Sequence, residues 1–134
     1  MGTIYGYMYG ENNESIDLIY KPVEKKSNEK KVRIFGEDFV RYNKDKCKIR
    51  YKDEEYDLKE YFNDIDINYN NKDMIKFKLT GVNRIKDMSW MFYKCDLIKS
   101  LDIISPWNTS NVEYMDLLFY GCHSLISLPD NFIL

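Results

Sequence analysis

The fold is decided by two similar stretches, NRIKDMSWMFYKCDLIKSL (residues 83–101) and SNVEYMDLLFYGCHSLISL (residues 110–128), which align without a gap. The alignment brings identical residues together, among them Met88 with Met115, Phe92 with Phe119, and Cys95 with Cys122. Apolar positions recur while polar positions vary, as in stacked repeats whose neighbouring copies bury the same side chains. The sequence therefore predicts two consecutive repeat units, with these six side chains buried together.

Each unit is expected to be a short helix followed by a short strand. In the second stretch the apolar residues follow the spacing of one helix face: Val112, Met115, Leu118, Phe119 and Cys122. Ser110 and Glu113 fit a capping box at its start, and Gly121 stands at its end. Residues 98–103 and 125–128 then fit the strand pattern of a leucine-rich repeat.

A family resemblance rests on three motifs in order: MSWMFYKC (88–95), SLDIISPWNTSNVEYM (100–115) and LFYGCHSLISLPD (118–130). Over roughly residues 81–131 the chain resembles the BspA-like leucine-rich repeats of bacterial surface lipoproteins and protist proteins. The resemblance implies a leucine-rich-repeat solenoid that serves adhesion or protein–protein recognition through its repeat surface. Members of that family usually carry many copies, whereas this chain has two.

The part of the chain that precedes the repeats indicates β structure. Apolar and polar residues alternate, as in half-buried strands, in four runs: 16–20, 32–34, 47–51 and 75–79. A hairpin turn is expected at residues 52–55 and a charged loop at residues 21–31. We expect this part to cap the first repeat, because an open solenoid end exposes its core.

The predicted fold class is therefore α+β, a small β-rich cap followed by a short leucine-rich-repeat-like solenoid of two helix–strand units. The predicted domains are a capping segment at residues 1–80 and a repeat region at residues 81–134. The repeat region divides into units at about residues 83–109 and 110–134.

The charge pattern disfavours two classes of partner. Lysine and arginine number 20 and aspartate and glutamate 22, and the two signs are interspersed along the chain. Nucleic-acid binding through a positive field requires clustered basic residues, and so does attachment to an anionic membrane surface. We therefore expect neither nucleic-acid binding nor membrane insertion.

Location follows from the absence of recognisable targeting segments in this stretch of sequence. Its apolar runs are too short to span a bilayer, and residues 1–13 lack the basic and apolar regions of a signal peptide. The expectation is a cytoplasmic protein by default, or a surface protein if the role implied by the resemblance holds. The partner and compartment are left open.

Catalysis and metal binding are not expected from the residues present. His123 is the single histidine, and its neighbour Cys122 points in another direction on a helix or strand. Zinc would need these two together with Cys47 and Cys95, but no pair has the close spacing of a zinc knuckle. We therefore predict a protein that is not an enzyme and holds no cofactor.

A calcium loop is also disfavoured. Residues 64–75 begin with oxygen-bearing side chains at alternating positions. The sixth position is Tyr69 instead of glycine, and the twelfth is Ile75 instead of glutamate. A polar loop between strands is the better interpretation of this stretch.

The predicted function is a non-enzymatic protein-interaction module, adhesin-like or scaffolding. Five outward-facing residues are candidate contacts with a protein partner: Trp90, Lys99, Asp102, Ser127 and Asp130. The alternative is a purely structural fragment that caps a longer repeat array. Residues 132–134 are three large apolar side chains with no following unit to cover them. That C-terminal end is expected to fold back, to associate with another copy, or to continue into further repeats.

Overall fold

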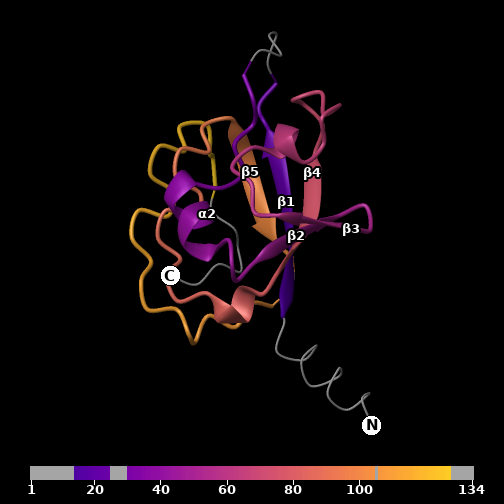
Figure 1. The fold of residues 1–134 in the computed structure, drawn as a ribbon. Coiled ribbons are helices and arrows are strands. Elements are labelled where there is room, and N and C mark those ends of the chain that lie inside the picture. Colours follow the sequence, from indigo (N-terminus) through magenta and orange to yellow (C-terminus); the bar gives the residue numbers. More distant parts are fainter. Residues whose placement is uncertain (1–13, 25–29, 105, 128–134) are drawn as a thin grey trace.

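The computed structural model describes residues 14–24, 30–104 and 106–127 (Figure 1). Its elements are, in chain order, β1 (Ser15–Pro22), α2 (Glu37–Asn43), β2 (Lys48–Tyr51), β3 (Glu54–Asp57), the 3₁₀ helix η1 (Phe62–Asp64), β4 (Ile75–Thr80), the 3₁₀ helix η2 (Val82–Arg84) and β5 (Ile98–Ile103). Among these helices, none has the length and apolar character needed to cross a membrane.

The five strands form one antiparallel sheet in the order β3-β2-β4-β1-β5. β1 lies in the interior of the sheet, with β4 on one side and β5 on the other. β2 pairs with the far side of β4 and carries β3 as its hairpin partner. Because β5 comes from the predicted repeat region and β1 from the predicted cap, both parts of the chain contribute to one sheet.

One face of this sheet carries the hydrophobic core, because apolar and polar residues alternate along the strands. On β1, Leu18 is fully buried and stands opposite Phe77 of β4 and Ile103 of β5. The centre of the core is aromatic, with ring contacts among Tyr20, Phe35, Phe39, Phe62, Phe77 and Phe92. The opposite face is polar and includes an ion pair between Lys78 and Asp17 at 3.3 Å.

α2 is the one α-helix of the described residues, and it packs against the core with the turns that follow β4 (Figure 1). The ring of Phe39 lies 5.3 Å from that of Phe35. Asn43 is 1% exposed and donates from its side chain to the carbonyls of Phe39 and Asp87, each at 3.1 Å. The helix is thereby tied to the turn region. The sequence did not predict it.

The predicted helices of the repeat units are wrong. The residues form consecutive turns in which a backbone N–H donates to the carbonyl three residues earlier, as Met91 does to Met88 at 3.2 Å. Trp90 and Lys94 both have φ of 59°, and such left-handed residues interrupt an α-helix. The described residues are therefore mostly β with one α-helix, and the predicted leucine-rich-repeat-like solenoid of helix–strand units is wrong as well.

The two turn segments, residues 85–95 and 112–122, nevertheless stack on each other. Backbone N–H groups of the first donate to carbonyls of the second: Met88 to Tyr114 (2.8 Å), Trp90 to Asp116 (2.9 Å), Phe92 to Leu118 (3.1 Å) and Lys94 to Tyr120 (2.8 Å). We call residues 85–95 the first turn segment and residues 112–122 the second turn segment.

Side chains and backbone angles correspond between the two segments in the register of the sequence alignment. The rings of Tyr93 and Tyr120 stack with centroids 5.5 Å apart. Left-handed backbone recurs too, since Trp90 corresponds to Leu117 (φ 53°) and Lys94 to Gly121 (φ 80°). The alignment of the two stretches is therefore confirmed as a pairing of residues, although the paired elements are turns.

Burial differs between the two segments. Met88, Phe92 and Cys95 of the first segment are buried, whereas their counterparts in the second are only half-buried: Met115, Phe119 and Cys122. The first segment lies between the sheet and the second segment, so it has packing partners on both sides. The prediction that all six are core residues holds fully for the first three.

Most of the strands predicted from period-two alternation are confirmed, unlike the predicted helices. Residues 16–20, 47–51 and 75–79 are confirmed within β1, β2 and β4. The strand at 98–103 is confirmed as β5, and the hairpin turn after β2 contains two left-handed residues, Lys52 and Asp53. The run at 32–34 is not a strand, because it makes a single bridge, between Arg33 and Tyr61. Residues 125–127 lie outside any strand.

Candidate functional site

A basic groove of about 450 Å³ opens on the surface of the molecule. Six side chains from three separate parts of the chain line it: Lys30, Lys31, Arg33, Tyr61, Lys94 and Asp96. Four of the six are cationic and one is anionic. An excess of one sign in a hollow concentrates ligands of the opposite sign, so the basic groove is a candidate site for an anionic ligand.

An extended stretch of backbone positions two of the cations. Val32 and Ile34 are fully buried, and their neighbours Lys31 and Arg33 point outward because side chains alternate along an extended chain. The stretch runs beside Tyr61, with which Arg33 forms an isolated antiparallel bridge. Buried side chains therefore fix the backbone that carries the cations.

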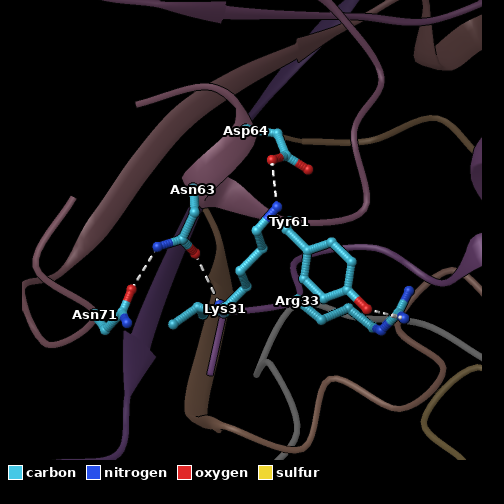
Figure 2. A network of polar contacts seen from close by, with 7 residues as sticks. Lys31, Arg33, Tyr61, Asn63, Asp64 and Asn71 are labelled. Atoms are coloured by element: carbon cyan, nitrogen blue, oxygen red, sulfur yellow. Dashed lines mark hydrogen bonds and ion pairs between the residues drawn. The ribbon is translucent and has the colours of Figure 1, made fainter. Parts of the chain in front are cut away.

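Two asparagines hold this stretch against the following loop, as Figure 2 shows. The side-chain oxygen of Asn63 accepts the backbone N–H of Val32 at 2.8 Å, and its amide nitrogen donates to Asn71. Asn71 is 7% exposed and donates to the carbonyl of Lys30 at 3.2 Å. The backbone of one groove wall is thus pinned from two sides.

Arg33 is the most fixed cation of the groove. Its Nη1 donates to Glu60 at 2.9 Å and to the carbonyl of Phe35 at 3.2 Å, and its Nη2 donates to the hydroxyl of Tyr61 at 2.6 Å (Figure 2). The guanidinium carbon lies 4.6 Å from the centroid of the Tyr61 ring. The remaining N–H groups, on Nε and Nη2, have no acceptor in the described parts of the chain.

The three lysines are more exposed. Lys30 pairs with Asp96 at 2.7 Å, and Lys31 pairs with Asp64 at 2.8 Å. The hydrogen bond and charge of Asp64 raise the pKa of Lys31. Lys94 has no carboxylate partner among the described residues, and its Nζ lies 5.3 Å from the ring centroid of Tyr93. Within that part of the chain, one cation of the groove is therefore uncompensated.

A second hollow of about 210 Å³ lies beside the groove at the start of α2. Arg33 and Lys94 line both hollows, so these two cations stand at the junction. The second hollow adds Tyr93 and two carboxylates, Glu37 and Asp38. The combined surface is cationic in the middle and acidic at one end.

The thiols are unsuited to nucleophilic chemistry. Burial raises the pKa of Cys47 to about 12 and raises that of Cys95 well above its ordinary value. Burial also raises the pKa of Cys122, whose Sγ donates to the carbonyl of Phe92 at 2.9 Å. Because the thiolate is the reactive form, these groups are poor nucleophiles at neutral pH. Within residues 14–24, 30–104 and 106–127, no three metal-binding side chains gather at one place.

Residues 56–129 match the family model described as "Mycoplasma protein of unknown function, DUF285". The chain belongs to the DUF285 family. No curated protein and no solved structure is similar to it at a significant level. The assignment to BspA-like leucine-rich repeats is therefore wrong, because the matched model is DUF285 and the matched residues fold as strands and stacked turns.

The DUF285 match divides the basic groove. Tyr61, Lys94 and Asp96 fall inside the matched residues, as do both turn segments, whereas Lys30, Lys31 and Arg33 precede them. The groove of this DUF285 chain therefore combines residues of the family region with cations that lie outside it.

The DUF285 chain places the predicted contact residues on separate elements. Trp90 is half-buried in the first turn segment, 6.3 Å from the ring of Tyr42 on α2. Lys99 and Asp102 are exposed on β5. Ser127 is exposed next to Ile126, whose N–H donates to the carbonyl of Lys99 at 3.1 Å. Lys99 and Ser127 thus lie on neighbouring strips of chain, while Trp90 stands apart and Asp130 lies outside the described residues.

The second turn segment of the DUF285 chain and the residues after it carry exposed apolar side chains. Four residues, more than half exposed, form what we call the outer turn surface: Tyr114, Leu117, Tyr120 and Ile126. This surface was not predicted, because most apolar positions of the repeat were expected in the core. The basic groove was not predicted either, because Lys30 and Lys31 were expected in a charged loop and Lys94 in a repeat helix. One feature of the sequence could have indicated the groove: Lys31 and Arg33 alternate with two apolar residues.

Proposed function

We propose that this chain is a non-enzymatic protein-interaction module that binds a polypeptide partner through its outer turn surface. The observation that carries the proposal is a row of backbone donors. In the first turn segment, the N–H groups of Met88, Trp90 and Lys94 hold the second segment. The corresponding N–H groups of the second segment, on Met115, Leu117 and Gly121, have no hydrogen-bond acceptor within the described residues.

An unpaired row of backbone donors is a template for pairing with another chain. Here the donors stand among exposed apolar side chains, including Leu117 and Tyr120, which are 51% and 61% exposed. Backbone hydrogen bonds supply affinity in such pairing, and side-chain contacts supply selectivity. This combination supports a polypeptide as the ligand.

The chemistry of the row also restricts the partner. The row offers donors, so the partner must bring acceptors such as backbone carbonyls. Two copies of this surface facing each other would oppose donor to donor. The favoured partner is therefore a different polypeptide that presents a row of backbone carbonyls. The adhesin-like role was implied only by the repeat resemblance, so it is not part of this proposal.

Site-specific photo-cross-linking tests the proposal. A photoreactive amino acid replaces Leu117 in one protein and, as a matched control, Ile67 in another, in cells that produce the chain. Ile67 is 89% exposed and belongs to the loop before β4, a loop that lies apart from the second turn segment (Figure 1). We expect a discrete cross-linked polypeptide from position 117 alone, and its loss when Tyr120 and Ile126 are changed to Ser. The same products from both positions would refute the proposal.

A further inference from the structure

We propose that the basic groove is a second binding site, separate from the outer turn surface, and that its ligand is an acidic peptide segment. The inference does not depend on the proposed function, because different side chains form the two surfaces. Its basis is the juxtaposition of Arg33 and Lys94, which line both the basic groove and the second hollow beside it.

Arg33 provides the directional contact. Glu60, Tyr61 and the Phe35 carbonyl occupy three of its five N–H groups and hold the guanidinium in one orientation. Its side chain is 17% exposed, so little rotational freedom remains to be lost on binding. The two unused N–H groups can donate to a carboxylate, which is the planar acceptor that a guanidinium recognises best together with phosphate.

Lys94 provides a charge that no carboxylate of the described residues compensates. The backbone of Gly121 lies so close to its stem that a Cβ at position 121 would stand 2.9 Å from Lys94 Cγ. The backbone N–H of Lys94 is also bound, to the carbonyl of Tyr120 at 2.8 Å. The second turn segment therefore fixes the backbone and stem of Lys94 beside Arg33, while the ammonium group of Lys94 is solvated.

Lys30 and Lys31 can contribute without a large loss of stability. Their side chains are 58% and 55% exposed, and their ion pairs with Asp96 and Asp64 lie at the rim. Exposed pairs of this kind contribute little to stability, because the charges are solvated. An incoming carboxylate can share either lysine at low cost.

The shape and surrounding charges favour a peptide over a nucleic acid. The groove of about 450 Å³, with a neighbouring hollow of about 210 Å³, has room for a few residues. Glu37 lines the second hollow as a carboxylate, together with Asp38, which pairs with Arg41. These carboxylates repel a continuous phosphate backbone but accept peptide N–H groups or a basic side chain. The chain as a whole carries a net charge of −2, so it lacks the broad positive field of nucleic-acid binders.

The test is fluorescence anisotropy with a fluorescein-labelled, capped hexaglutamate peptide and the full chain. We expect saturable binding that weakens as salt is raised. Lys94→Gln should weaken binding about fivefold and Arg33→Gln about tenfold or more. The matched control is Lys76→Gln, which removes one exposed lysine from the polar face of β4 and should leave the affinity unchanged.

A second measurement protects the result against misfolding of Arg33→Gln. Titration of the wild-type chain with the peptide, followed by NMR, should shift the resonances of Tyr61 and Lys94 more than those of the outer turn surface. The inference is overturned by absent or non-saturable binding, or by equal effects of Lys94→Gln and Lys76→Gln. Competition by inorganic phosphate at lower concentration than unlabelled peptide would also overturn it, since the groove would then be a small phosphate site.

Discussion

The rings of Phe92 and Phe119 stack with centroids 5.4 Å apart and planes inclined by 13°, although the two residues belong to different turn segments. Phe92 is 1% exposed and also contacts the rings of Tyr20 and Phe35. Phe119 is half-buried at the outer side of the same stack. This pair connects the core of the sheet to the second turn segment, so it bears on both stability and the outer turn surface.

Truncation of the two rings should have unequal effects. We expect Phe92→Ala to lower the free energy of unfolding by about 3–5 kcal/mol, because a fully buried ring leaves a cavity. Phe119→Ala should cost less, since part of its ring is already solvated and the site can relax. Urea unfolding of both variants measures the difference. Equal losses would show that the second turn segment is as much a part of the core as the first.

Two glycines should respond differently to an added methyl group. At Gly36 a Cβ would stand 2.1 Å from the carbonyl oxygen of Trp90, so Gly36→Ala must displace the start of α2. We expect a loss of about 3 kcal/mol, at the upper end for overpacking. At Gly121, with φ of 80°, the nearest atom is the flexible Cγ of Lys94, and Gly121→Ala should cost about 1–2 kcal/mol.

The opposite change at another left-handed position provides the control for backbone strain. Leu117→Gly, at φ of 53°, should raise stability or leave it unchanged, because glycine adopts this conformation without strain. Thermal unfolding of the three variants gives the order. A neutral Gly121→Ala together with a destabilising Leu117→Gly would show that these two positions do not have left-handed backbone.

The sequence predicted the sheet better than the repeat for a physical reason. Alternation with period two indicates an extended chain, so β1, β2 and β4 were found, although the extended run at 32–34 is not a strand. Apolar residues at three-residue spacing, such as Met88 and Met91, suit a helix and also a chain of three-residue turns. The left-handed backbone at Trp90 and Lys94 excludes the helix in favour of turns. Neither tryptophan nor lysine is a residue type that predicts this conformation. α2 was missed because it has seven residues and no side-chain cap at Gly36.

The basic groove could be anticipated only in part. Alternation around Arg33 predicts that its charge points away from the core. The position of Tyr61 beside it depends on a bridge between distant residues, and that of Lys94 on the turns that follow β4. A single sequence does not carry this long-range information. Its run of lysines is as consistent with a solvated loop as with a binding groove.

Stability should fall at alkaline pH. Burial raises the pKa of Cys47 from its ordinary value of 9.0 to about 12. Between these values the unfolded chain has lost the thiol proton and the folded chain retains it. The stabilising contribution is thus fully present below pH 9 and is lost as the pH rises toward 12, with a slope of at most about 1.4 kcal/mol per pH unit for one group.

Urea unfolding at several pH values between 8 and 11 measures this slope, with Cys47→Ala as the comparison. The Ala variant should be less stable at pH 8 but should lose stability less steeply as the pH rises. Tyr20 and Cys95, whose pKa values burial also raises, account for the slope that remains. An identical slope in both proteins would mean that Cys47 is accessible to water in the folded state.

Amide hydrogen exchange should distinguish the two turn segments. The N–H groups of Met88, Trp90 and Lys94 donate to backbone carbonyls at 2.8–2.9 Å, and we expect them to exchange slowly. Those of Leu117 and Gly121 have no acceptor in the described residues and should exchange near the rate of an unstructured peptide. NMR exchange spectra of the isolated chain measure both groups in one experiment, so each segment serves as the reference for the other.

The same measurement connects this backbone to the proposed partner. A polypeptide that pairs with the outer turn surface should slow the exchange of Leu117 and Gly121 while leaving Met88 and Trp90 unchanged, because the latter are already bonded within the chain. A ligand of the basic groove should instead affect side-chain resonances of Arg33 and Lys94. If Leu117 and Gly121 are as strongly protected as Met88 in the isolated chain, their donors are already engaged, and the row is not free to bind a partner.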